Sequence, residues 1–536
     1  MTADVADAVV IGAGPNGLVA ANVLADAGWD VLVLEAQAEP GGAVRTAELT
    51  APGFRNDVFS AFYPLAYPPA PLARLDLEAH GLAWAQAPAV VAHPRADGPA
   101  AVLHRAPEAT AAGLDATAPG DGEAWLRLHD RWQREGTAVL RAFMAPFPPV
   151  LPGARALARI GPRNVLPLLR FLLLPVRRLG DEQFRGDGAK LLLVGNALHA
   201  DVAPDAPPSG FLGWLLASLA QDGGFPTPVG GAGELVAALV RRLGSRGGRL
   251  RCGAPVERVV TEGGRAVGVE VAGSPVRARR AVLADVDAEV LFRRLLRPDD
   301  LPARTRAALD GYQRSWATVK VDWALRTPIP WRDATVGAAG TVHIADSIDE
   351  LALQAAAISG SRIPDDPFVV LGQMTTADPT RSPEGTESAW AYTHVPFHVR
   401  DRNGTRPISA AEVDLVVERV EDRVEQHAPG FRGRVIARHV LSPAELERRD
   451  ANLVQGDNAG GTNQLHQQLV FRPLPGLGRP ETPVRGLYLA SASAHPGGGV
   501  HGACGTNAAR AALAAQRVRR LVSLPRPAPR QAAPGG

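Results

Sequence analysis

The stretch that decides the fold is residues 7–35, which read DAVVIGAGPNGLVAANVLADAGWDVLVLE. Its glycine motif is Gly12-x-Gly14-x-x-Gly17. An apolar strand pattern precedes the motif, and a helical stretch of Ala, Leu and Val follows it, then a second strand pattern that ends at Glu35. These parts predict one strand–helix–strand unit. The glycines allow a tight turn and close approach of a dinucleotide pyrophosphate, to which the helix N-terminus presents free N–H groups.

The residues around the motif extend this predicted dinucleotide site. Pro15 and Asn16 lie inside the motif at the predicted helix start, and Ala36 follows Glu35. Glu35 comes 18 residues after Gly17, where an acid accepts hydrogen bonds from an adenosine ribose. A carboxylate at that position repels a 2′-phosphate. The sequence therefore disfavours NADP.

A second glycine-rich stretch distinguishes between dinucleotides. Residues 35–46 read EAQAEPGGAVRT and contain Gly41, Gly42 and Arg45. Two consecutive glycines past the ribose acid let a second loop close over the pyrophosphate, as a long, extended FAD requires, so we predict FAD. The E-x5-GG-x-x-RT pattern resembles the second signature of the FAD-binding fold shared by amine oxidases and carotenoid desaturases. Arg45 either balances the charge of phosphate or reduced flavin or is an ordinary surface arginine.

The C-terminal stretch carries the most specific resemblance. Residues 486–509 read GLYLASASAHPGGGVHGACGTNAA and resemble the closing FAD motif of the phytoene-desaturase-like flavoproteins, which include carotenoid desaturases, a carotene ketolase and retinol saturase. The resemblance implies that this loop passes the FAD phosphates and that the following helix start faces the flavin pyrimidine, where its partial positive charge stabilises a reduced, anionic flavin. A strand that begins at Val256 also resembles the family. The residues in the closing motif that the resemblance assigns to FAD are Ser491, Ala492, Gly499, Val500, Gly502 and Asn507.

The sequence departs from related flavoproteins before this loop. Many of them place an acidic residue there to hold the ribityl chain, whereas this sequence has Ser491 and Ser493. Hydrogen bonds to a charged acceptor are about twice as strong as neutral ones, so we expect weaker FAD binding than in relatives. We find no second strand-linked GxGxxG motif and expect no NAD(P)H site. Oxygen or a quinone-like acceptor is then expected to reoxidise the flavin.

The patterns and the resemblance together predict an α/β protein. We expect a discontinuous FAD-binding Rossmann-like domain that is interrupted by an inserted α+β substrate domain. The predicted FAD-binding segments are 1–75, 225–297 and 484–524, the substrate-domain segments are 76–224 and 298–483, and 525–536 is a predicted disordered tail.

Two residues are candidate catalytic groups. Lys320 lies in a predicted strand, and of 57 basic residues only it and Lys190 are lysines. In flavin amine oxidases a lysine in a similar context bridges to flavin N5 through a water; a strand lysine that extends its charge to solvent is the alternative. His495, like His501, flanks the closing glycine loop, where an imidazole can donate to a flavin oxygen or act as acid or base near neutral pH. Simple packing of the turn is the alternative.

Composition and charge limit the partners. The 57 basic and 55 acidic residues give a net charge of +2, too little to favour a nucleic acid. Two cysteines exclude a disulfide scaffold and a CxxC site, and we expect no metal. The sequence shows no targeting signal, and its most apolar run, residues 165–176, is too short to span a bilayer, so we expect a cytoplasmic protein. That run either lines a buried cavity or, with Arg177 and Arg178, makes peripheral contact with a membrane.

The resemblance and the apolar middle of the chain predict an FAD-dependent oxidoreductase. As a dehydrogenase or desaturase, it would take a hydride from an apolar small molecule such as a terpenoid, carotenoid or polyketide-like compound. A flavin amine oxidase is one alternative. The other is a non-enzymatic lipid-binding escort of the same fold, like the GDP-dissociation inhibitors, which have lost the FAD loop that this sequence retains.

Overall fold

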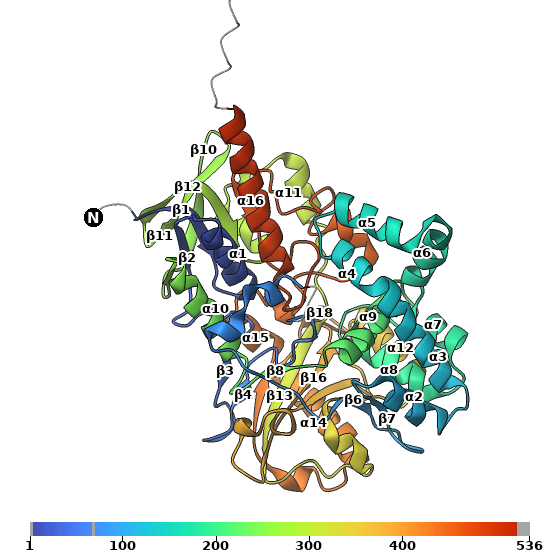
Figure 1. The fold of residues 1–536 in the computed structure, drawn as a ribbon. Helices are drawn as coiled ribbons and strands as arrows, with labels where there is room; N and C mark the ends of the chain where they lie inside the picture. Colours follow the sequence, from blue (N-terminus) through green and yellow to red (C-terminus); the bar gives the residue numbers. More distant parts are fainter. Residues whose placement is uncertain (1–3, 67–69, 523–536) are drawn as a thin grey trace, which may run out of the picture.

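The computed structural model describes residues 4–66 and 70–522, so the predicted disordered tail 525–536 lies outside the described residues. Two seven-stranded sheets dominate this part of the chain (Figure 1). The first sheet has its long path in the order β10-β11-β12-β1-β2-β9, with β20 beside β12. Its strands are β1 (Asp4–Ile11), β2 (Val31–Leu34), β9 (Arg249–Arg251), β10 (Val256–Glu262), β11 (Arg265–Val271), β12 (Ser274–Ala284) and β20 (Leu487–Leu489).

The centre of the first sheet is parallel and joins three distant parts of the chain. β1 pairs in parallel with both β2 and β12, and β12 pairs in parallel with β20. The carboxyl ends of these strands therefore meet at one edge, where ligands bind in open α/β sheets. Helices α1 (Pro15–Asp26), α10 (Gly233–Ser245) and α16 (Ala503–Val522) pack together on one face, with α1 between the other two (Figure 1).

The second sheet belongs to the other half of the molecule. Its order is β19-β13-β16-β15-β14-β6-β7. The strands are β6 (Ala89–His93), β7 (Ala101–Leu103), β13 (Ala317–Leu325), β14 (Ala339–Ile344), β15 (Val369–Gln373), β16 (Glu387–Val395) and β19 (Val435–Leu441). Helix α14 (Ala410–His427) covers one face with a row of valines, and helices α8 (Asp187–Ala197) and α9 (Ser209–Asp222) lie on the other.

The remaining helices are mostly short and surround these layers. Those of the first half of the chain are α2 (Pro107–Asp115), α3 (Asp121–Arg131), α4 (Thr137–Phe143), α5 (Val150–Ile160), α6 (Val165–Leu173) and α7 (Val176–Gln183). Later in the chain come α11 (Ala303–Leu309), α12 (Ile348–Ser359), α13 (Met374–Ala377) and α15 (Pro443–Arg449). Three two-stranded ribbons complete the fold: β3 (Thr46–Ala47) with β4 (Asn56–Asp57), β5 (Trp84–Ala85) with β8 (Thr227–Pro228), and β17 (His398–Asp401) with β18 (Gly404–Pro407).

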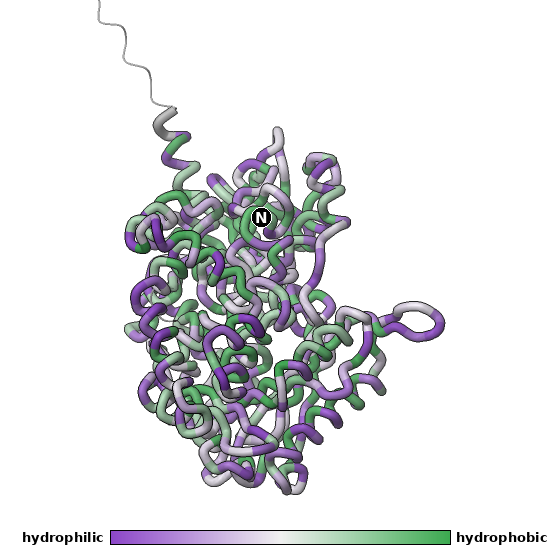
Figure 2. Tube along the Cα trace, turned by 90° about the vertical axis from the view of Figure 1, so that its right-hand side faces the viewer, coloured by the Kyte–Doolittle hydropathy of each residue, from purple (hydrophilic) through white to green (hydrophobic). Residues whose placement is uncertain are grey.

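The observed architecture confirms the predicted α/β class. Parallel strands with helices form one half, and a mixed sheet with helices on both faces forms the other. Apolar stretches alternate with polar ones along the trace, and many polar loops lie at the outside (Figure 2). Within residues 4–66 and 70–522, none of the helices combines the length and the apolar character needed to cross a bilayer.

Candidate functional site

One cavity of about 450 Å³ is lined by both halves of the molecule. At one end lie the β1–α1 turn and the closing loop of the C-terminal segment, and at the other lies the second sheet. Of the residues predicted from the sequence, those on its wall are Gly14, Pro15, Asn16, Gly42, Lys320, Ser491, Ala492, Gly499 and Val500. Segments that are hundreds of residues apart in the chain thus converge on one space.

The β1–α1 turn leaves no room for side chains. A Cβ atom on Gly14 would lie 2.7 Å from Asp285 Oδ2, and one on Gly17 would lie 2.3 Å from Gly12 O. The Gly17 N–H donates to Asp285 Oδ2 at 2.7 Å. The turn therefore presents bare backbone, together with a helix N-terminus, to the cavity.

Glu35 directly follows β2, in the place predicted for the ribose acid. Its Oε2 accepts the Ala13 N–H at 2.7 Å and its Oε1 accepts the Gln37 N–H at 2.9 Å. These bonds hold the carboxylate in one orientation, while each oxygen keeps a further lone pair for a ligand hydroxyl. Ala36 continues from Glu35, and the Glu35 carbonyl accepts the Ala254 N–H at 2.8 Å, which brings the start of β10 at Val256 close by.

The second glycine pair packs directly on the first turn. The Gly41 N–H donates to Ala13 O at 2.9 Å, and a Cβ on Gly42 would lie 3.1 Å from Gly14 Cα. Arg45 donates to Gly42 O at 3.1 Å and to Arg449 O at 2.7 Å. Arg45 therefore stabilises this loop, and its guanidinium donates hydrogen bonds to backbone carbonyls.

Two aspartates that were not singled out from the sequence lie beside the two serines of the closing segment. β12 lies beside β20, so Asp285 and Asp287, just past the end of β12, stand next to Ser491 and Ser493. The Ser493 hydroxyl donates to Asp287 Oδ2 at 3.3 Å. Burial, with the nearby carboxylates Asp450 and Glu35, raises the pKa of Asp285 to about 8. The sequence signal was an Asp-x-Asp directly after a predicted strand.

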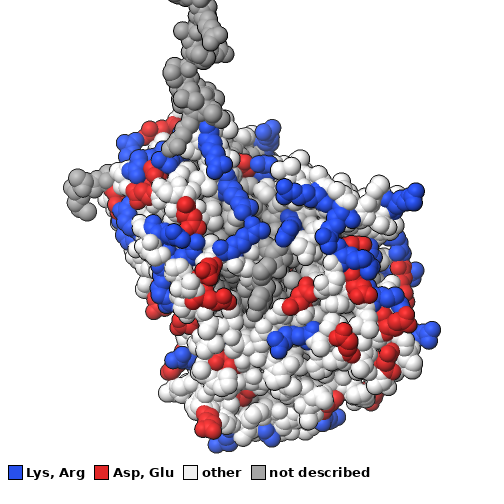
Figure 3. Space-filling view, viewed as in Figure 1, with Lys and Arg blue, Asp and Glu red and all other residues white. Residues whose placement is uncertain are grey.

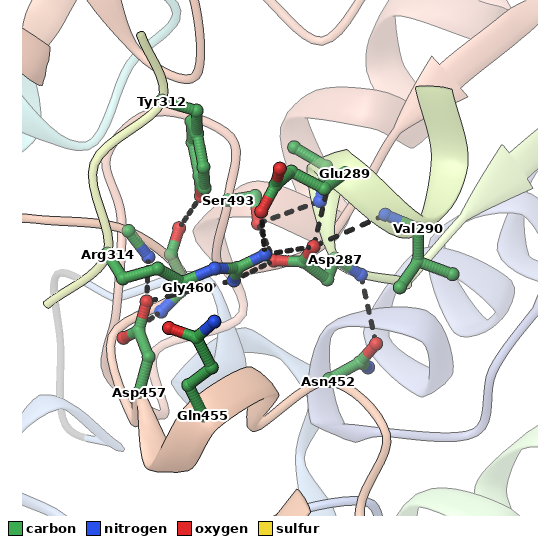
Figure 4. A network of polar contacts seen from close by, with 12 residues as sticks. Asp287, Glu289, Val290, Tyr312, Arg314, Asn452, Gln455, Asp457, Gly460 and Ser493 are labelled. Carbon is green, nitrogen blue, oxygen red and sulfur yellow. Dashed lines mark hydrogen bonds and ion pairs between the residues drawn. The ribbon is translucent and has the colours of Figure 1, made fainter. Parts of the chain in front are cut away.

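A buried polar network holds these segments in register (Figure 4). Arg314 donates to both carboxylate oxygens of Asp287 at 2.7 and 2.9 Å. Asn452 accepts the Asp287 N–H at 2.9 Å and donates to Asp285 O at 3.0 Å. Asp457 accepts three consecutive backbone N–H groups in residues 459–461. The loop after β12 is thereby tied to the segment that follows α15.

One wall of the cavity is apolar, and we call it the apolar roof. Residues 59–65, α4 and its C-terminal turn, α9 and Phe225 form it. Its large apolar side chains are Phe59, Phe62, Leu65, Leu140, Phe143, Met144, Leu212, Leu215, Leu216 and Phe225. Such a wall excludes water from the space beside the dinucleotide end.

The two predicted catalytic residues lie in different surroundings. Lys320 is on the cavity wall and 3% exposed, and its Nζ donates to Asp322 Oδ1 and Oδ2 at 2.5 and 2.6 Å and to Asp57 O at 3.0 Å. His495 is packed edge-on against Phe143, with its ring centroid 5.7 Å away, and burial lowers its pKa to about 4. Both catalytic roles remain predictions.

Two residues of the closing motif contact protein rather than the cavity. Asn507 Nδ2 donates to Met144 O at 2.9 Å. A Cβ on Gly502 would lie 3.0 Å from Val19 Cγ2, so Gly502 lets α16 approach α1. Both residues therefore make packing contacts that position the closing segment.

The residues at the dinucleotide end fit FAD. Asn16 Oδ1 is buried on the cavity wall and has no hydrogen-bond partner among the described residues. Together with the bare glycine turns and the Glu35 carboxylate, it leaves polar groups that a dinucleotide would satisfy.

Comparison with known proteins decides the family. The model of a family described as flavin containing amine oxidoreductase matches residues 16–388. The chain belongs to this family. It is therefore an FAD-dependent oxidoreductase, in agreement with the geometry of the dinucleotide end.

Individual relatives of the flavoenzyme cover more than nine tenths of its length. It is 29% identical to the mouse protein "Pyridine nucleotide-disulfide oxidoreductase domain-containing protein 2", covering 94% of this chain and 92% of that one. It is 26% identical to an "All-trans-zeta-carotene desaturase" of Myxococcus xanthus, covering 92% and 90%. Cyclohexylamine oxidase from Brevibacterium oxydans shares the fold, with a TM-score of 0.59, 16% identity and coverage of 96% and 100%.

Proposed function

We propose that this FAD-dependent oxidoreductase is a dehydrogenase or desaturase that takes a hydride from an apolar small molecule. The observation that carries the proposal is the continuous cavity, whose apolar roof lies next to the dinucleotide end. The similarity to a carotene desaturase supports the same reading. A terpenoid, carotenoid or polyketide-like compound suits such a wall, and oxidation would leave a new double bond in it.

FAD supplies the hydride acceptor when it is bound. The chain's own residues would hold and shield the reactants: the glycine turns would admit the phosphates, Glu35 would accept hydrogen bonds from the ribose hydroxyls, and the apolar roof would keep water away. His199 lies on the cavity wall, and burial lowers its pKa to about 4. Its ring nitrogens lie 2.8 Å from His343 Nε2 and 3.2 Å from the Tyr392 hydroxyl, so His199 helps to hold the cavity wall, and the proton leaving the substrate would pass to water. Oxygen or a quinone-like molecule would take the electrons in a second step.

We also propose that the face formed by α5 and α6 makes peripheral contact with an anionic membrane. Six large apolar side chains are exposed on these two helices, with Leu166 75% exposed; they are Val150, Leu151, Leu157, Leu166, Leu169 and Leu173. Residues 150–173 also contain four arginines and no acidic residue. Figure 3 shows basic side chains on this side of the molecule together with acidic ones, and Arg170 pairs with Glu182. Exposed leucines with surrounding cations are typical of helices that lie on anionic lipid.

The position of this face favours substrate entry from the membrane. α5 packs against α4 and α6 packs against α9, and both α4 and α9 line the cavity. An apolar compound dissolved in lipid would therefore start next to the wall of its binding site.

Anaerobic reduction of the FAD-loaded protein tests the proposed reaction. A panel of terpenoids and carotenoids, presented in lipid vesicles, is mixed with the protein, and loss of the yellow flavin absorbance is followed. We expect members of this panel to bleach the flavin, while alkyl amines leave it oxidised. Bleaching by amines alone would identify an amine oxidase instead and overturn the proposal.

A further inference from the structure

The cavity floor is one face of the second sheet, and that face carries polar side chains beside Trp390. In the sheet register Lys320 on β13 lies opposite Tyr392 on β16. Thr341 on β14 lies opposite Gly372 on β15, and Gly372 in turn lies opposite Trp390 on β16. Side chains alternate between faces along each strand, so these residues share one face. The opposite face carries the apolar residues packed beneath α14. A polar face buried against an apolar roof indicates a ligand with a polar group.

Three atoms on this wall lack a partner. Asn196 Oδ1, Thr318 Oγ1 and Thr341 Oγ1 are buried and accept or donate no hydrogen bond within the described part of the chain. Their residues are 0%, 5% and 2% exposed. Native proteins rarely leave buried polar atoms unpaired, because the lost hydration is not replaced.

The orientation of Asn196 is set by its own helix. Its Nδ2 donates to Leu192 O at 2.8 Å, so the atom left free is the acceptor Oδ1. The end of α8 also packs directly on β14, where His199 Nε2 lies 2.8 Å from His343 Nε2. Asn196 and Thr341 flank this contact, one on each element. An unpartnered acceptor and an unpartnered hydroxyl thus lie on two neighbouring elements of the cavity wall.

The charges near this floor are already matched. The three N–H protons of Lys320 are taken by Asp322 and by Asp57 O. Burial lowers the pKa of His199 to about 4 and holds the pKa of His343 well below its usual range, so both rings are neutral. A charged head group would find no unpaired counter-charge among these residues.

We infer that the floor binds a neutral hydroxyl group on an otherwise apolar molecule. The hydroxyl would donate to Asn196 Oδ1 and accept from the Thr341 hydroxyl, so both orphaned atoms gain a partner. This inference rests on the proposed function and narrows its substrate class from apolar compounds in general to apolar alcohols.

Binding of matched ten-carbon probes to the FAD-loaded protein tests the inference. The probes are decan-1-ol, its methyl ether, decylamine and decanoate, and the signal is the change in flavin absorbance on binding. The methyl ether keeps the oxygen but cannot donate to Asn196. We expect decan-1-ol to bind about tenfold more tightly than the other three. The methyl ether and decanoate lack a donor for Asn196 Oδ1, and the decylammonium cation finds no counter-charge at the floor.

Matched variants locate the effect. Thr341→Val and Asn196→Leu should each remove the preference for the alcohol. Thr393→Val is the control, since Thr393 is also buried with an unpartnered hydroxyl in the described structure but lies on the opposite face of β16. We expect this control to keep the tenfold preference. Equal binding of the methyl ether or of either charged probe by the wild type, or the same loss in Thr393→Val, would overturn the inference.

The outcome is separable from that of the proposed reaction. Probe binding is measured without turnover. A preference for the alcohol, with no reduction of the flavin by any apolar compound, would refute the hydride proposal and leave the inference standing. Reduction by apolar hydrocarbons without any alcohol preference would end the inference alone.

Discussion

We expect Asp285 to set how FAD binding at the β1–α1 turn responds to pH. It is buried against the glycine turn and accepts the Gly17 N–H. The titratable groups around it are Glu35 at the end of β2, Asp450 after α15 and Cys504 on α16. Burial and the two acids raise the pKa of Asp285 to about 8, so the carboxyl is neutral at pH 7 and becomes an anion above pH 8. A neutral carboxyl tolerates a diphosphate, whereas a carboxylate repels it.

We therefore expect FAD binding to weaken in base. If the ionised form binds poorly, the dissociation constant of FAD should rise about tenfold between pH 7 and pH 9. Asp285→Asn should bind FAD with a nearly constant affinity across that range. Titration of FAD into the protein at several pH values, followed by flavin fluorescence, measures both. A wild-type affinity that does not change with pH would contradict this role.

Lys320 has both a structural and a predicted catalytic role, and paired substitutions separate them. Lys320→Met leaves Asp322 buried without its partner, which should cost about 3–5 kcal/mol in the free energy of unfolding. In Lys320→Met/Asp322→Leu most of this stability should return, because both charges are gone. Denaturant unfolding measures the stability, and anaerobic flavin reduction measures the reaction. If Lys320 acts at the flavin, flavin reduction stays slow in the double variant even though its stability returns. A wild-type rate of reduction in the double variant would show that Lys320 serves only as the partner of Asp322.

At the scale of elements, helices α5 and α6 form the surface that we propose meets a membrane. Leu166→Ser/Leu169→Ser removes two exposed apolar side chains, each worth up to about 2 kcal/mol when buried in lipid. We expect binding to anionic phospholipid vesicles, measured by sedimentation, to fall at least tenfold. The control is Leu353→Ser/Leu415→Ser, which changes two exposed leucines on α12 and α14. Equal loss in both double variants would refute a role for this face.

Local patterns predicted single elements well. The glycine motif and its flanking apolar runs predicted the β1–α1–β2 unit because turn, helix start and strand period all lie within thirty residues. The closing loop before α16 was predicted from resemblance. Neighbour relations between distant strands were not predictable. That β12 lies beside β20 places Asp285 and Asp287 next to Ser491, and no local signal carries that pairing. The polar side chains of the cavity floor could not be predicted from the sequence for the same reason, because their placement depends on the register of β13, β14 and β16.

At the scale of the whole molecule, the network around Arg314 joins the two halves. Arg314 lies just before β13, the strand that enters the second sheet. It pairs with Asp287 and Glu289, which lie on the segment after β12 (Figure 4). Asn452 connects the same aspartate to the segment after α15. The position of the FAD-binding edge relative to the substrate cavity therefore depends on buried charges as well as on apolar packing.

Arg314→Met should be costly for this reason. It leaves Asp287 buried without its cation, so we expect a loss of about 3–5 kcal/mol in the free energy of unfolding and weaker FAD binding. Arg293→Met is the matched control, because Arg293 pairs with Glu289 and Asp310 at the surface and should change stability by less than about 1 kcal/mol. Denaturant unfolding of both variants measures the difference. Similar losses in the two would show that the buried network has no special role.

The central claim is that three distant segments form one cradle for FAD beside an apolar cavity. Titration of FAD into the wild-type chain and into Gly14→Val, with folding of the variant checked by circular dichroism, tests it most directly. A side chain at Gly14 would fill the space next to Asp285 Oδ2. We predict that the wild type binds one FAD per chain and that the folded variant binds none. A folded Gly14→Val protein that binds FAD as tightly as the wild type would contradict the claim.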